Sequence, residues 1–117
     1  ATVKVPVTSK TIPFIEKFTQ RHKETPNTAA FDTYDAIYVL KQALERANTW
    51  KADRLVSALE QTNYDGVIGN IQFSRTLHGL NLAKPNLYWY FGQWQRGELV
   101  PVWSPDKPNE VRDLVLP

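Results

Sequence analysis

Residues 29–47 have the sequence AAFDTYDAIYVLKQALERA, and this stretch decides the fold class of the chain. Its apolar residues recur at the three- and four-residue spacing of a helix face. Pro26, Asn27 and Thr28 precede it and Asn48 follows it, and these residue types are common at helix starts and stops. We therefore predict a long helix over 29–47. Its expected buried stripe consists of Ala30, Tyr34, Ile37, Leu40, Leu44 and Ala47.

Two shorter helices are predicted on either side of it. The first is expected to start with Thr11 as its cap and to end near Lys23, because Pro26 cannot continue a helix. Its shared face carries Phe14, Phe18 and His22, with the histidine at the edge of the core. The third helix is expected to be capped by Thr49 and to end near Thr62. Its apolar residues are Leu55, Val56 and Leu59.

Beyond residue 62 the pattern changes from helix to strand. Residues 63–70 contain Asp65-Gly66 and Gly69-Asn70, which are typical of turns. Alternating or aromatic-rich segments predict strands over 67–73, 87–95 and 99–103, with Arg96-Gly97 as a tight hairpin turn. The predicted fold class is α/β, with three helices followed by a strand and a C-terminal β-hairpin. Too few strand–helix alternations occur for a complete parallel sheet.

The organisation that we expect is a single unit over 1–117. It comprises a helical part over about 11–62, a β part over about 66–103 and an extended tail over 104–117. Val111, Leu114 and Leu116 make this tail too apolar to be purely solvated. The chain starts with Ala1 and contains no Met, so we expect it to be part of a longer protein.

Composition argues against several classes of function. The chain has no Cys, so neither disulfides nor thiol chemistry is expected. Its 14 basic and 12 acidic residues give a net charge of +2, too balanced for a nucleic-acid-binding protein. The two histidines, His22 and His78, have no partner at metal-motif spacing. We therefore expect no catalytic residues, no metal site, no cofactor and no nucleic-acid partner.

Two groups of residues have both a structural and a functional interpretation. Asp32 and Asp35 start the long helix, where the helix dipole favours carboxylates, but they could also lie at a ligand cleft walled by Phe31 and Tyr34. The aromatic series after residue 87 could stack on a sugar or base, although packing on both strand faces is the favoured interpretation. It consists of Tyr88, Trp89, Tyr90, Phe91, Trp94 and Trp103.

Five segments, in order along the chain, resemble the type I periplasmic solute-binding proteins of ABC importers, the receptors for branched-chain amino acids, amides and urea. The resemblance covers about Ile12 to Pro105, with two departures: Asn70 stands where proline is usual, and 74–81 lacks an acidic, glycine-containing turn. The segments are the helix over 14–23, the AA–YDA helix over 29–48, the L–AL pattern over 55–59, YDGVIGNIQF over 64–73 and GQWQRGELVPVW over 92–103.

The resemblance implies a partial lobe of the type I periplasmic binding protein fold. In that family two α/β lobes close on the ligand, and most ligand contacts would come from the missing N-terminal part of the protein. The start of the 29–47 helix is the one region here that is expected to face the cleft. Phe31 is the nearest candidate for ligand contact, together with Asp32 and Tyr34.

The function implied is non-enzymatic capture of a small polar solute, of the amino acid or amide class, for an ABC permease. The expected location is periplasmic or extracellular, with a possible lipid anchor in the full-length protein. Two alternatives remain open: a self-standing interaction or oligomerisation module, which could be a homo-oligomer, and a ligand-sensing domain of a regulator.

Overall fold

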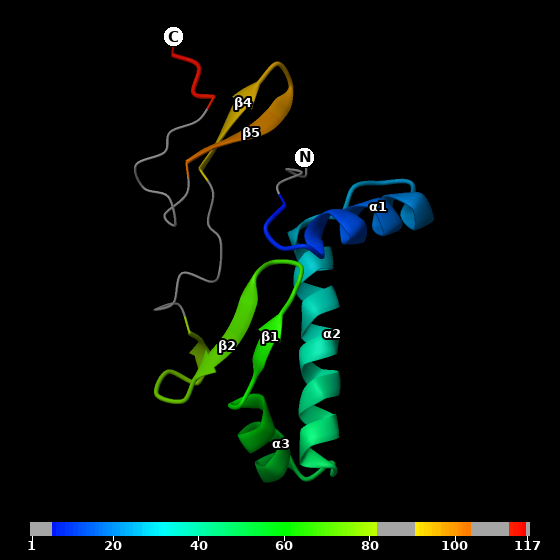
Figure 1. The fold of residues 1–117 in the computed structure, drawn as a ribbon, viewed down its shortest axis with the longest axis vertical. Helices are drawn as coiled ribbons and strands as arrows, with labels where there is room; N and C mark the ends of the chain where they lie inside the picture. The colour runs from blue at the N-terminus through cyan, green and yellow to red at the C-terminus, as the bar shows by residue number, and fades with distance from the viewer. Residues whose placement is uncertain (1–5, 82–90, 104–112, 117) are drawn as a thin grey trace.

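A long helix with a β-hairpin along one side organises the computed structural model, which describes residues 6–81, 91–103 and 113–116 (Figure 1). The α/β class predicted from the sequence is confirmed. The elements are α1 (Thr11–His22), α2 (Thr28–Ala47), α3 (Ala52–Leu59), β1 (Asn63–Asp65), β2 (Asn70–Ser74), β3 (Gly79–Leu80), β4 (Phe91–Gln95) and β5 (Glu98–Trp103).

The ends of α2 are those that the sequence predicts. The Asn27 side chain accepts a hydrogen bond from the Ala30 N–H at 3.0 Å, which satisfies one of the free amides of the first turn. At the other end Asn48 adopts the left-handed conformation, with φ of 47°, and its N–H donates to the Leu44 carbonyl. Helix α1 ends in the same way at Lys23, where φ is 62°.

The stripe predicted to be buried on α2 is wrong. Ile37 is 60% exposed and Leu40 is 40% exposed, while the buried residues are Asp35, Val39 and Ala43, one turn apart. The helix therefore has apolar residues on two opposite sides. Periodicity detects both sides, but it does not show which of them another element covers.

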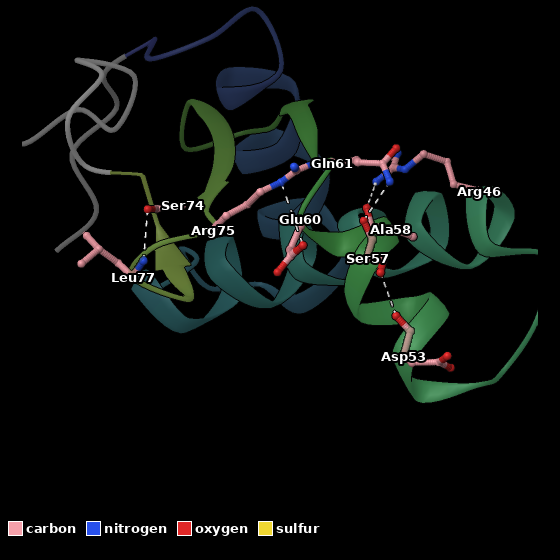
Figure 2. Close-up of polar contacts among 9 residues, drawn as sticks. All are labelled: Arg46, Asp53, Ser57, Ala58, Glu60, Gln61, Ser74, Arg75 and Leu77. Atoms are coloured by element: carbon pink, nitrogen blue, oxygen red, sulfur yellow. Dashed lines mark hydrogen bonds and ion pairs between the residues drawn. The ribbon is translucent and has the colours of Figure 1, made fainter.

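Helix α3 lies against the C-terminal end of α2 (Figure 1). Thr49 does not cap it: the N-cap is Lys51, and the Thr49 hydroxyl accepts only the Lys51 N–H at 3.3 Å. Arg46 joins the two helices by donating to the Ala58 carbonyl at 3.0 Å (Figure 2). It also donates to the Thr62 hydroxyl at 3.3 Å. Only Ala58 of this short helix is buried.

A strand that the sequence does not predict, β1, follows α3, and the strand predicted over 67–73 is β2, which starts only at Asn70. Residues 63–65 form β1 instead of a turn, and they pair antiparallel with β2, with Tyr64 opposite Ile71. The turn comprises 66–69 alone, and β3 adds two residues on the other side of β2. Tyr64 and Ile71 face α2 and form a core with Val39, against which Leu59, Ile68 and Phe73 pack. Burial of these side chains holds the hairpin against the helix.

A second sheet consists of β4 and β5, joined by the predicted turn at Arg96-Gly97. Both turn residues have positive φ, 51° and 85°, as the tight turns of twisted hairpins require. Phe91 and Trp94 are 64% and 63% exposed, so the packing expected on both faces of this strand is wrong for these two residues. Tyr88, Trp89, Tyr90 and Val111 lie outside the described residues, as does most of the strand predicted over 87–95 before Phe91.

The described part of the tail is also exposed, in contrast to the prediction that its apolar residues would be sheltered. Leu114 and Leu116 are both exposed. Side-chain amides of β4 nevertheless hold this segment: Gln93 exchanges two hydrogen bonds with the backbone of Val115, at 2.8 and 2.9 Å. Gln95 donates to the Asp113 carbonyl.

Candidate functional site

An aromatic cluster lies where α1 crosses the first turns of α2. The Phe14 ring is 4.9 Å from the Phe31 ring and 4.7 Å from the Tyr34 ring, measured between centroids. The series continues along α2 and onto the hairpin through Tyr38 and Tyr64. Phe18 adjoins Phe14 on α1. Tilted rings at these distances attract one another in addition to the area that they bury.

A hollow of about 450 Å³ lies beside this cluster, within the size range of small-molecule sites. Tyr34 lines it, but Phe31 packs under Phe14 and Asp32 is exposed on α2 without lining the hollow. The structure therefore brings Phe31 and Tyr34 into one cluster and leaves Asp32 apart. The lining residues are Phe14, Phe18, Asn27, Ala29, Ala30, Thr33 and Tyr34.

The hydroxyl of Tyr34 is a neutral hydrogen-bonding group. A side-chain hydrogen bond with Tyr38, together with burial, raises the pKa of Tyr34 to about 12. The phenol therefore stays protonated at physiological pH. It offers an apolar ring and a polar tip to the same side of the helix.

Asp35 occupies neither of the positions considered for it from the sequence. Its carboxylate is fully buried and accepts the Val67 N–H at 2.9 and 2.8 Å and the Ile68 N–H at 3.1 Å. Burial raises the pKa of Asp35, while the amides of Val67 and Ile68 act in the opposite direction. Asp35 thus fastens α2 to the turn of the hairpin, instead of facing a cleft.

Residues just before and within α1 hold the same turn from the other side. Thr8 donates to the Gly66 carbonyl at 2.8 Å, and Thr11 donates to the Val67 carbonyl at 2.7 Å. The Lys10 ammonium bonds to the Asp65 carbonyl and lies 4.7 Å above the Tyr64 ring. Asp65 at the end of β1, together with the turn over 66–69, is therefore the point at which α1, α2 and the hairpin meet.

Sequence analysis missed these anchoring residues, Thr8, Lys10, Thr11 and Asp35. An analysis of apolar periodicity assigns Asp35 to the exposed side of its helix, because aspartate is polar. Thr11 is predicted only as a helix cap. The one sequence feature that could have indicated the contact is the turn Asp65-Gly66, because its free amides require an acceptor.

The two histidines belong to different elements of the structure, His22 to the end of α1 and His78 to the turn before β3. His22 is exposed instead of lying at the edge of the core, although its ring is 4.4 Å from that of Phe18. His78 is exposed in the turn before β3. Across the described ranges 6–81, 91–103 and 113–116, no cluster of three potential metal ligands occurs. In the same residues no helix has the length and apolar character needed to cross a membrane.

Comparison with protein families decides where this arrangement belongs. The sequence profile of the family described as periplasmic binding protein matches residues 7–98, most of the chain. The chain belongs to this family. No curated protein and no solved structure matched the chain in the other two comparisons.

Family membership confirms the sequence resemblance at the family level and gives the chain a general role in binding a solute. The matched range contains the aromatic cluster, the Asp35 contact and both sides of the hairpin β1–β2. The family is one of binding proteins, consistent with a surface whose described features are a hollow and hydrogen-bonding groups.

Proposed function

We propose that this chain is the C-terminal part of an extracellular solute-binding protein, which captures a small polar solute of the amino acid or amide class for an ABC permease. The observation that carries the proposal is the family match over 7–98. The position of Tyr34 beside an open hollow at the start of α2 supports a contact with the solute there. The single-unit organisation over 1–117 remains part of this proposal.

Binding would use hydrogen bonds and closure of two lobes, with no covalent step and no cofactor. Tyr34 would present its hydroxyl, and Phe31 would hold the ring of Phe14 in place beside it. Asp32 is exposed on α2 and does not line the hollow, so it would contact the solute only from the rim. A hollow open on one side buries too little of a solute for tight binding, so the opposing wall would come from the N-terminal part of the protein.

Calorimetry with leucine, urea and acetamide tests this proposal. The chain alone should bind each of them weakly or not at all, and coexpression with its N-terminal part should give binding at micromolar or lower concentration. Tyr34→Ala should weaken that binding, while Trp50→Ala, an exposed aromatic residue beyond the C-terminal end of α2 that does not line the hollow, should not. Micromolar binding by the chain alone would contradict the proposal.

The permease and the location form a second part of the proposal. Delivery to an ABC permease requires a periplasmic or extracellular protein, with a lipid anchor as one means of retention. Cell fractionation of the full-length protein checks this. Recovery in the cytoplasmic fraction would instead favour a ligand-sensing domain of a regulator.

A self-standing interaction module is the second candidate, and exposed apolar residues favour it. Ile37, Leu40, Phe91 and Trp94 are exposed together with the tail residues Leu114 and Leu116. Exposed apolar groups of this kind are commonly covered by another chain. Sedimentation velocity at micromolar concentration, with and without the N-terminal part, distinguishes the candidates: a homo-oligomer that persists when the N-terminal part is present would favour the module, and its replacement by a one-to-one complex would favour the solute receptor.

A further inference from the structure

A second hollow lies along α1 and shares Phe14, Phe18 and Tyr34 with the first, and its lining combines aromatic rings with positive charges. Its volume is about 410 Å³, and its lining includes Lys10, Lys17 and Arg21 beside Phe14, Phe18 and Tyr34. A hollow of this volume, lined by aromatic rings and a few charged groups, is typical of small-molecule sites. The solute-binding role proposed above does not use the positive charges of this hollow.

Helical spacing explains why these residues share a surface. Positions 10, 14 and 18, and positions 14, 17 and 21, are three or four residues apart, so their side chains lie along one side of α1. The rings of Phe14 and Phe18 are half-buried and lie 5.8 Å apart, forming an apolar floor. Tyr34, reaching over from α2, forms the wall of the hollow.

The charge of this surface is of one sign. Among the residues that the structure describes, no Asp or Glu lines the hollow. Lys17 and Arg21 are exposed, and neither forms an ion pair with any residue in the part of the chain that the structure describes. Lys10 is fixed at one end by the Asp65 carbonyl and the Tyr64 ring. Two free cations above a row of rings complement a ligand with an anionic group on a flat apolar body.

We propose that the α1 hollow binds small aromatic carboxylates. The ring of such a ligand would lie against Phe14 and Phe18, and its carboxylate would face Lys17 and Arg21. A guanidinium matches a carboxylate with two parallel hydrogen bonds, which favours a carboxylate over a spherical anion. The site is formed by this chain alone, so its occupancy does not require the second lobe.

Benzoate titrated into the ¹⁵N-labelled 117-residue chain tests the proposal by NMR. The largest amide shifts are expected in α1 and around Tyr34. Benzamide, which has the ring without the charge, and acetate, which has the charge without the ring, should each bind at least about fivefold more weakly. Added salt should weaken benzoate, because exposed charges are screened. Equal binding of benzamide and benzoate, or shifts scattered over the chain, would overturn the proposal.

Matched charge removals complete the test. Lys17→Gln with Arg21→Gln should weaken benzoate by about threefold to tenfold, the effect of losing two exposed ion pairs. Lys51→Gln with Arg54→Gln removes the same charge from the exposed surface of α3 and should leave the affinity unchanged. Both pairs are exposed, so far-UV circular dichroism should show both variants folded. An equal loss in both variants would mean that net charge, and not this site, attracts the anion.

These outcomes are independent of the solute-receptor proposal. Failure of benzoate binding to the chain alone would overturn the α1 site and leave the receptor proposal intact. Failure of leucine, urea and acetamide to bind the chain together with its N-terminal part would have the opposite effect.

Discussion

A buried carboxylate must recover the hydrogen bonds that it loses with water, and Asp35 recovers them from the amides of Val67 and Ile68. The two amides belong to the turn between β1 and β2, in which Val67 is buried away from solvent. The contact therefore supplies hydrogen-bond donors to the carboxylate and an acceptor to the two backbone amides.

Replacing Asp35 with Asn should destabilise the protein at pH 7. The amide has one acceptor oxygen in place of two, so one backbone N–H loses part of its partner. We expect a loss of about 1–3 kcal/mol in the free energy of unfolding, measured by chemical denaturation. Asp32→Asn, an exposed change on the same helix, should cost less than about 0.5 kcal/mol. Equal losses would show that the buried hydrogen bonds of Asp35 contribute no more to stability than the exposed side chain of Asp32.

The contribution of Asp35 should depend on pH. Burial raises its pKa above the ordinary value of 3.8, with Asp32 adding to the shift, and the Val67 and Ile68 amides and Lys10 oppose it. Because the folded pKa is the higher one, the part of the stability that depends on protonation of Asp35 is fully present below about pH 4 and is lost as pH rises through the folded pKa. The hydrogen bonds from Val67 and Ile68 remain at pH 7. The unfolding free energy of the wild type relative to Asp35→Asn should therefore fall between pH 4 and pH 7. A rise over this range would contradict the prediction.

Gly66 is required by the same contact. A Cβ atom at this position would overlap the carboxyl group of Asp35. Gly66→Ala must therefore displace the carboxylate from the turn, and we expect a loss of about 2–4 kcal/mol in denaturant melts. Gly79→Ala is the matched control, since its Cβ would come no closer than 3.7 Å to the Leu77 carbonyl oxygen and should cost less than about 1 kcal/mol. Similar costs at the two glycines would remove the steric argument.

At the scale of the element, α2 has two apolar sides with different environments. Val39 is 5% exposed between Tyr64 and Ile71, while Ile37 projects from the opposite side. We expect Val39→Ala to cost about 1–3 kcal/mol and Ile37→Ala less than about 0.5 kcal/mol in the chain alone. Equal costs would mean that a second chain covers Ile37 in solution.

The sequence was sufficient for the existence and order of the helices, for both ends of α2 and for the C-terminal end of α1, because Asn27, Asn48 and Lys23 act locally on the backbone. It was insufficient for the ends of α3, whose N-cap is Lys51 and which ends at Leu59. It was insufficient for the buried face of α2. The helix has apolar residues on two sides, and only tertiary contacts determine which side is buried. It also missed β1, since Asn63 and Asp65 favour turns and only pairing with β2 makes them a strand.

The candidate site shows the same division. Phe31 and Tyr34 were singled out from the start of the helix and do share a cluster. Their partner Phe14 comes from α1, and the crossing of two helices is not encoded in the spacing within either one. Their role in contacting a solute remains a prediction.

At the scale of the whole molecule, the contacts that organise the fold lie within residues 8–73. The anchors Thr8, Thr11 and Asp35 and the core around Val39 all belong to this range. A chain truncated to residues 6–81 should therefore unfold cooperatively, with a midpoint within a few degrees of that of the 117-residue chain. Thermal melts followed by far-UV circular dichroism check this. A broad, non-cooperative melt would show that β4 and β5 contribute to the core.

The bond between Asp35 and Val67 joins residues 32 positions apart in the sequence. Amide protons in a surface turn ordinarily exchange with deuterium through small local openings. Those of Val67 and Ile68 can reach solvent only when the helix and the hairpin separate. Their exchange should therefore be as slow as that of the amides in the middle of α2. Exchange in this turn would then report the separation of α1 and α2 from the β1–β2 hairpin.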